Sequence, residues 1–381
     1  MKSTKIINGT YTSAKIFTCA SPENELDDYA AVQLQMLCDN PVSQGSKIRV
    51  MPDVHPGKVG TVGLTMTVGA RVMPNIVGID IGCGMTLAEM NGKRVEFQKL
   101  DTVIRERVPS GFHIRSSVHR FADSFDFSRL ACAGRIRKDK ALHSLGTLGG
   151  GNHFIEIDKD DENHMYAVVH SGSRHLGKEV TEYYLSEGQK QLKDKQIDVP
   201  YELTWLEGSL KEDYLHDLEI VQEYAALNRQ IMLEELAKGM KWKYKDMYSC
   251  IHNYVDDSSE QPILRKGAIS AKEGEMVIIP VNMRDGILLG TGRGNEDWNQ
   301  SAPHGAGRIL KREDVKSCHT LAEFKKAMKG IYSPSINKET LDEAPFAYRG
   351  LEEIAAVIGD TVTISKTIRP VYNFKAGAQE R

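Results

Sequence analysis

Short apolar runs rich in β-branched residues recur along the chain, and each borders a cluster of glycines. The runs are IRVMPDV (48–54), LTMTV (64–68), FIEI (154–157), YAVV (166–169), MVIIPV (276–281) and GILL (286–289). Runs of this length beside glycine predict strands that end in glycine loops, where backbone amides can approach a ligand closely. Because the clusters do not recur at a fixed period, a solenoid or a propeller is not expected.

Helical periodicity appears in a different part of the chain, from about residue 207 to 239. Apolar side chains recur there at helical spacing among many charges, which predicts a long amphipathic helix that ends at Gly239. Farther along, Thr320 and Glu323 form the pattern of a capping box, which predicts the start of another helix.

The C-terminal part of the chain predicts one more helix and a final strand. The helix covers residues 347–358 and stops at Gly359, and the tail from Thr361 returns to strand character. Strands and helices thus mix without regular βαβ alternation, which predicts an α+β fold with a β core, flanking helices and an inserted helical hairpin. No linker rich in proline or serine marks a boundary, so residues 1–381 are expected to form a single domain.

Composition and charge limit the classes of function. The 381 residues carry 49 Lys plus Arg against 52 Asp plus Glu, a formal net charge of −3. This balance excludes a polycationic scaffold that holds nucleic acid by bulk charge, but not a local basic groove. No apolar stretch reaches the roughly 18 residues of a membrane span, and the first residues lack a secretory signal. A cytoplasmic protein without a membrane partner is expected; the oligomeric state stays open, a monomer included.

The cysteines are scattered along the chain without a CxxC pair. They are Cys19, Cys38, Cys83, Cys132, Cys250 and Cys318. Such scatter disfavours both a secreted disulfide framework and a structural zinc knuckle. Five of the six are interpreted as small buried residues or exposed free thiols.

The sixth, Cys83, belongs to a candidate metal site. It follows Asp80 by three residues in a glycine-rich turn, so one turn could aim a carboxylate and a thiolate at the same ion. Histidines also lie in or beside glycine-flanked strand ends: His153, His170, His252 and His304. Carboxylate, thiolate and imidazole ligands suit a divalent transition metal. The thiolate argues against magnesium and calcium, whereas manganese, iron, cobalt and zinc remain open.

His304 has the context of a phosphoryl acceptor, within SAPHGAGR (301–308). An imidazole can form a phosphoramidate, the small residues after it leave room for phosphate, and Arg308 offers a forked donor. A helix starting at this point would add its N-terminal amides to the anion site. The chain lacks the P-loop, the HExxH motif and the Lys-x-Asp-Gly element of lysine-adenylating ligases.

Seven ordered motifs together resemble the RtcB family of RNA ligases. They are MPDVHPGK (51–58), VGIDIGCGM (77–85), LGTLGGGNHFIE (145–156), HSGSR (170–174), HNY (252–254), RKGA (265–268) and SAPHGAGR (301–308). The resemblance extends from roughly residue 48 to Lys375 and implies an RtcB-like single catalytic domain over residues 1–381.

The resemblance implies an activity as well. The family uses GTP and manganese to join RNA 3′-phosphate or 2′,3′-cyclic phosphate ends to 5′-hydroxyl ends, in RNA repair or tRNA splicing. By this resemblance His304 is the guanylylated nucleophile, and Asp53 takes part in the ligation step. GMP passes from the histidine to the RNA 3′-phosphate, and the 5′-hydroxyl then displaces it.

The resemblance also implies the ligands of the cofactors. The metal ligands that it implies are Asp80, Cys83, His153, His170 and His252, with Cys83 bridging two manganese ions. The nucleotide contacts that it implies are Asn152, Glu156, Tyr348 and Lys375. Asn282 is a further candidate nucleotide contact. It and Ile287 stand where many family members have two serines that contact the nucleotide, which raises the question of nucleotide preference.

RNA contacts and rival functions complete the expectations. Arg174 and Arg308 are candidate phosphate binders, and the basic run GRIRKDK (134–140) is either a solvated surface or an RNA clamp. Second-choice candidates are His55, His143 and His175. The rivals are a metal-dependent phosphoesterase that processes RNA ends without sealing them, and a family member that binds RNA without catalysis.

Overall fold

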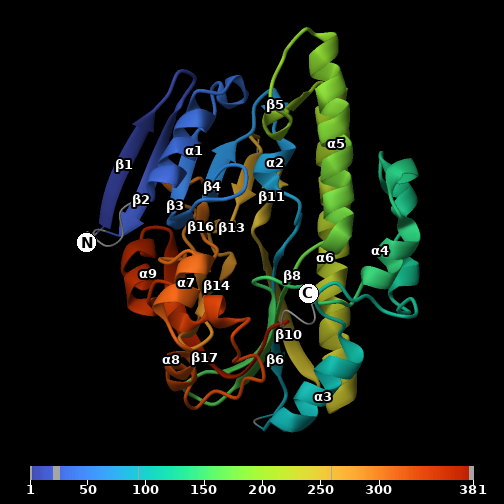
Figure 1. Cartoon of the computed structure of the whole chain (residues 1–381), viewed down its shortest axis with the longest axis vertical. Coiled ribbons are helices and arrows are strands. Elements are labelled where there is room, and N and C mark those ends of the chain that lie inside the picture. The colour runs from blue at the N-terminus through green and yellow to red at the C-terminus, as the bar shows by residue number, and fades with distance from the viewer. Residues whose placement is uncertain (1, 20–25, 93, 259, 377–381) are drawn as a thin grey trace.

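Two large β-sheets and a pair of long helices build the molecule (Figure 1). This computed structural model describes residues 2–19, 26–92, 94–258 and 260–376. The predicted α+β class is confirmed, because helices and strands mix without repeated βαβ units.

The first sheet has six strands, in the order β1-β2-β3-β4-β12-β11. Their bounds are β1 Lys2–Asn8, β2 Ser13–Cys19, β3 Ile48–His55, β4 Val62–Thr67, β12 Ile263–Lys266 and β11 Asn253–Asp256. β2 and β3 pair in parallel, and the other neighbours pair antiparallel. The end of β3 carries Asp53, in a stretch where the pairing with β4 is irregular, and His55, which pairs with Val62 of β4. A glycine-rich loop follows His55.

The second sheet has seven strands, in the order β10-β6-β8-β7-β17-β15-β14, with all neighbours antiparallel. Their bounds are β10 Tyr244–Ile251, β6 Gly84–Met90, β8 Met165–Ser171, β7 Phe154–Lys159, β17 Val362–Phe374, β15 Gly286–Gly292 and β14 Met276–Asn282. His170 pairs with Met85 of β6 and with Phe154 of β7. The register therefore brings the chain segments around Cys83, His153 and His170 to the same end of the sheet.

One of the connections between the two large sheets consists of a single residue. β10 of the second sheet ends at Ile251 and β11 of the first sheet begins at Asn253, so His252 is the link. There are also two small two-stranded sheets among the described residues: β13 Ala268–Ser270 with β16 Ser301–Pro303, and β5 Arg71–Val72 with β9 Leu206–Glu207. β16 leads directly into His304.

The predicted helical hairpin is formed by α5 (Arg174–Asp194) and α6 (Ser209–Met240), which extend along one side of the molecule (Figure 1). The predicted end of the long helix at Gly239 is wrong by one residue. The helix continues to Met240 and is closed by Lys241 in the left-handed conformation, with φ of 59°. Gly239 lies inside the helix, where an added Cβ would approach Val103 to 2.4 Å.

The other helices are shorter. The α-helices are α1 Asp28–Cys38, α2 Pro74–Val77, α3 Phe97–Arg107, α4 Lys138–Ser144, α7 Arg312–Cys318, α8 Leu321–Ala327 and α9 Leu351–Ile358. The 3₁₀ turns are η2 Pro41–Ser43, η3 Ala122–Ser124, η4 Phe127–Arg129, η5 Ala133–Arg135, η6 Tyr201–Leu203, η7 Glu296–Trp298, η8 Leu341–Glu343 and η9 Pro345–Ala347. None of the helices in the described ranges is long and apolar enough to cross a membrane.

Two helix starts test the sequence predictions. The capping box of Thr320 and Glu323 is confirmed at the start of α8. The helix predicted to begin at 347 begins only at Leu351, because the chain first forms the turn η9 and then an extended residue, Tyr348. Tyr348 forms an isolated β-bridge with Arg308, and this bridge cannot form from a helical backbone.

The α6 helix packs against the cores of both large sheets. Its first half places Leu218, Val221 and Tyr224 in the apolar cluster around the first sheet and α1. Its second half places Met232 and Leu236 in the cluster between the second sheet and α3. Each such fully buried side chain contributes about 1.5–3 kcal/mol to folding.

Candidate active site

Five predicted metal ligands converge at the end of the second sheet. The Sγ of Cys83 lies 3.4 Å from Nε2 of His153 and 3.4 Å from Nε2 of His170, and all three side chains are buried. Their donor atoms lie within 4.8 Å of one another. Asp80 Oδ2 is 3.0 Å from Nε2 of His153, and Nε2 of His252 is 3.4 Å from Nε2 of His170.

Glycines fix the positions of these ligands. Between Asp80 and Cys83 the chain makes a tight turn, in which the Cys83 amide donates to the Asp80 carbonyl at 3.2 Å. Gly82 has a φ of 67°, a conformation that side chains disfavour. A Cβ at Gly172 would lie 2.1 Å from Asp80 Oδ1, so only glycine leaves space for this carboxylate.

The protonation states of the cluster fit a bound cation. Nδ1 of His153 donates to the Leu148 carbonyl at 2.9 Å, which leaves Nε2 as the ligand atom. Burial lowers the pKa of His170 and of His252 well below the usual value, so both imidazoles are neutral. Burial and the neighbouring Asp80 raise the pKa of the Cys83 thiol, so a thiolate here needs a cation beside it. This donor set fits a divalent transition metal.

His304 lies next to this cluster and is held by Asp53. Its Nδ1 is 2.7 Å from Oδ2 of Asp53, which is fully buried at the end of β3. The rings of His304 and His252 are 4.7 Å apart between centroids. With Nδ1 engaged, Nε2 is the atom left for chemistry. No helix starts at His304, so helix N-terminal amides do not contribute at this point: the chain bends after β16, and α7 begins at Arg312.

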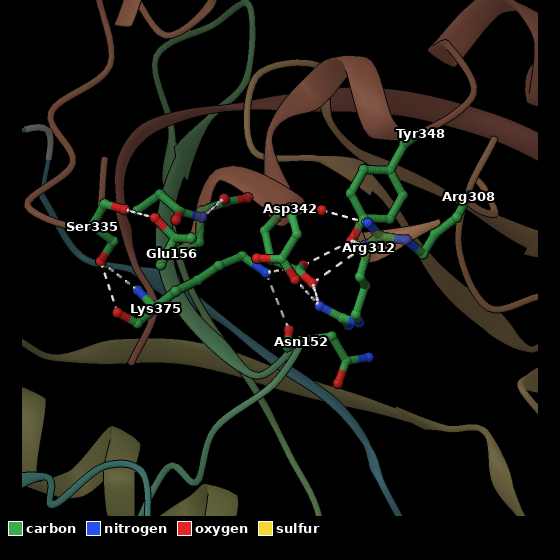
Figure 2. A network of polar contacts seen from close by, with 11 residues as sticks. Asn152, Glu156, Arg308, Arg312, Ser335, Asp342, Tyr348 and Lys375 are labelled. Atoms are coloured by element: carbon green, nitrogen blue, oxygen red, sulfur yellow. Dashed lines mark hydrogen bonds and ion pairs between the residues drawn. The ribbon is translucent and has the colours of Figure 1, made fainter. Parts of the chain in front are cut away.

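A cavity of about 150 Å³ opens beside His304 and gathers the predicted nucleotide contacts. Its lining includes Asn152, Glu156, Asn282, His304, Arg308, Tyr348 and Lys375. Figure 2 shows that Arg308, Arg312, Tyr348 and Lys375 belong to one network of polar contacts along this wall. Residues far apart in sequence thus surround a single cavity.

Glu343 is the centre of that network and was not predicted. Its buried carboxylate accepts from Tyr348 Oη at 2.7 Å, Lys375 Nζ at 2.9 Å and Arg308 Nη1 at 3.3 Å. Arg312, also not predicted, pairs with it at 2.5 Å. Burial opposes ionisation of Glu343, but the charges of these cations hold its pKa below the usual range. A signal for Arg312 exists, four residues after Arg308; the sequence around Glu343 offers none.

The two positions that depart from the family pattern have different surroundings. Asn282 lines the cavity, but its Oδ1 accepts from the amides of Arg284 and Asp285 at 3.0 and 2.9 Å, which closes the turn after β14. Ile287 is fully buried in an apolar cluster with Ile368 and does not line the cavity.

The remaining candidates divide between the cavity and its surroundings. His55 lines the cavity, and burial lowers its pKa to about 4. Arg174 is outside the lining and donates to the Gly111 carbonyl at 2.6 Å and to Thr147 Oγ1 at 3.0 Å. His143 and His175 also lie outside the lining.

The basic run 134–140 lies on the surface around the start of α4. Arg137 pairs with Glu179 of α5, and the side chains of Arg135, Lys138 and Lys140 are exposed. From α4 the chain continues into the loop that carries Asn152 and His153, so the run adjoins the site along the chain.

Fold and site together define a class: an α+β protein in which a cluster of candidate metal ligands lies beside a histidine that faces a cavity lined by cationic side chains. The chain belongs to the RtcB family, because the family model described as tRNA-splicing ligase RtcB matches residues 33–376.

Named relatives agree with this membership. The chain is 29% identical over 367 residues to the RNA-splicing ligase RtcB of Escherichia coli K12, and this match covers 86% of the chain and 90% of the relative. The RNA-splicing ligase RtcB1 of E. coli strain ATCC 25922 matches to the same extent. The tRNA-splicing ligase RtcB of Nanoarchaeum equitans is 27% identical over 420 residues, covering 86% of the chain and 87% of the relative.

Proposed function

We propose that this protein is a GTP- and manganese-dependent RNA ligase that joins 3′-phosphate or 2′,3′-cyclic phosphate ends to 5′-hydroxyl ends. The observation that carries the proposal is His304: Asp53 holds it beside the metal cluster, in a cavity lined by Glu156, Tyr348 and Lys375. The relatives named as RNA-splicing and tRNA-splicing ligases support it. The proposed setting is cytoplasmic RNA repair or tRNA splicing.

The first proposed step is the transfer of GMP to His304. Nε2 forms a bond to the α-phosphorus of GTP while the bond to the bridging oxygen breaks, and pyrophosphate leaves. Asp53 keeps Nδ1 protonated and stabilises the positive charge that the ring gains during attack. The cations of Arg308, Arg312 and Lys375 lie near enough to the cavity to offset phosphate charge.

The proposed second and third steps join the RNA ends. A 2′,3′-cyclic phosphate end is first opened by water to the 3′-phosphate. An oxygen of the 3′-phosphate then attacks the phosphorus of GMP and the bond to His304 Nε2 breaks. Finally the 5′-hydroxyl, losing its proton to solvent, attacks the activated RNA phosphorus, and GMP leaves. Arg174 and the basic run 134–140 are the proposed contacts for the RNA backbone.

The metal ligands have a separate role in the proposal. Asp80, Cys83, His153, His170 and His252 would hold up to two manganese ions. Bound there, the ions supply positive charge for the entering and leaving oxygens of the displacement.

Incubation with manganese and GTP labelled at the α-phosphate tests the proposal. We expect a covalent nucleotide adduct that is lost in H304A and kept in H143A, since His143 lies outside the cavity. RNA with 3′-phosphate and 5′-hydroxyl ends should then be sealed. Absence of an adduct with GTP and with ATP would overturn the proposal and leave end processing or RNA binding as the function.

A further inference from the structure

Asp158 is a buried acid near the proposed nucleotide cavity, and no described residue donates a hydrogen bond to it. Asp158 lies on β7, two residues after Glu156, so both side chains point to the same face of the sheet. Asp158 is fully buried, and neither of its carboxylate oxygens accepts a hydrogen bond from any described residue. A buried ionised carboxylate without donors is very unfavourable.

Glu156 is the ionisable side chain that interacts with Asp158. Across the sheet, Asp158 faces Tyr166 of β8 and Pro370 of β17, and the Tyr166 hydroxyl donates instead to Asp160. Other strands of the same sheet contribute apolar side chains such as Ile278 and Leu289 to the cluster that includes Tyr166. The interaction between the two carboxyls and burial both raise the pKa of Asp158 well above its usual value.

Glu156, unlike Asp158, has polar partners that favour its ionised form. It lines the cavity and accepts a hydrogen bond from Asn373 of β17, and the charge of Lys375 acts on it. Farther along the wall, Glu343 already pairs with Lys375, Arg308 and Arg312. Burial raises the pKa of Glu156 to about 7 even so. Two acids in one buried place do not both ionise, so one proton is shared between them.

We infer that Asp158 is a positioning residue: it stays protonated and donates its O–H to Glu156, which keeps Glu156 ionised and selects guanine over adenine. This inference rests on the proposed function of the cavity as a nucleotide site. A carboxylic acid kept neutral by an apolar site can act as such a donor.

The selection follows from the hydrogen-bonding edges of the bases. Guanine presents two donors, N1–H and N2–H, which match the two oxygens of an ionised Glu156. Adenine presents one donor and one acceptor, which match a protonated Glu156. Base preference should therefore change with pH, guanine being favoured above the pKa of Glu156 and adenine below it.

The test measures the binding of GMP and AMP to the full chain with manganese from about pH 6 to about pH 9.5. For the wild type we expect GMP affinity to fall about tenfold per pH unit below a midpoint near 7, while AMP affinity rises. D158A removes the donor and should move the midpoint upward by about one to two pH units. D158N still donates to Glu156 and should restore the wild-type midpoint.

The matched control is D160N, two residues after Asp158 and just beyond the end of β7. The Asp160 carboxylate accepts from Tyr166 Oη and pairs with Lys366, so it is held away from Glu156. It should keep the wild-type midpoint. Equal midpoints in the wild type and D158A would overturn the inference and leave the proposed function standing. Absence of GMP binding at every pH would overturn both.

Infrared spectroscopy provides a measurement that does not depend on D158A folding. At about pH 8 the wild type should show the C=O stretch of a buried protonated carboxylic acid, and D158N should lack it. A spectrum without that band in the wild type would overturn the inference.

Discussion

At the scale of single residues, the pair of His304 and Asp53 decides how reactive the site can be. A carboxylate that binds Nδ1 selects the tautomer and fixes the ring, as in other enzymes with a histidine oriented by an acid. Asp53 is fully buried and its second oxygen has no partner among the described residues, so the contact with His304 is its main interaction there.

The prediction at this scale concerns D53N. The amide keeps the shape of the side chain but cannot stabilise a positive imidazole, so formation of the nucleotide adduct should slow about a hundredfold or more. Rapid-quench measurement of a single turnover would give the rate. Binding of GMP should stay within about twofold of the wild type, and an unchanged adduct rate would contradict the proposed role of Asp53.

Single residues also show how far the sequence alone could lead. Asp80, Cys83, His153 and His170 could be recognised because each lies close to glycines at a predicted strand end. His252 has no glycine near it in the sequence, and the HNY motif of the family resemblance indicates it instead. Glu343 and Asp158 could not, because their importance arises from side chains that meet through tertiary packing. Nothing near either residue in the sequence indicates that it is buried or what it contacts.

At the scale of elements, α6 holds the loops of the site. Asn228 accepts from the amides of Gly146 and Thr147 at 2.8 and 3.0 Å and donates to the Gly172 carbonyl at 3.1 Å. Arg229 donates to the carbonyls of Gly82 and Ser171, both at 2.9 Å. The amphipathic pattern predicted this helix, but not the polar residues on its buried face. A helix that is buried on several sides no longer separates apolar from polar residues by face.

The end of α6 gives the prediction at this scale. G239A should gain up to about 1 kcal/mol in helix propensity, yet its Cβ would meet the stiff side chain of Val103 at 2.4 Å. Overpacking costs about 1–3 kcal/mol, so the free energy of unfolding should fall. Chemical denaturation would measure it. G359A is the matched control, because a Cβ there has open space; a loss of stability in G359A and not in G239A would contradict this account.

At the scale of the whole molecule, α6 contributes to the cores of both large sheets. We therefore propose that residues 1–381 act as one unit, as the absence of linkers in the sequence indicated. The net charge of −3 belongs to the same scale, because it limits how much of the RNA backbone the surface can attract.

The prediction at this scale is a shallow salt dependence of RNA binding. With a slightly negative molecule, affinity should rest on about 2–4 phosphate contacts, so the slope of log K against log salt should be about −1.4 to −2.8. Binding titrations over a range of KCl concentrations would measure it. Replacing Lys138 and Lys140 with alanine should flatten the slope if the run 134–140 contacts RNA. A slope typical of a polycationic binder would contradict the expectation.

The position of His252 has a mechanical consequence. Three candidate ligands belong to one end of the second sheet, whereas His252 is the residue at which the chain leaves that sheet for the first. A metal bound to Cys83, His153, His170 and His252 would link the two sheets directly. Any movement of one sheet relative to the other would then stretch the bond between the metal and His252. Substitutions at the interface between the sheets could therefore alter metal affinity without touching a ligand, and metal loading should make the two sheets harder to separate.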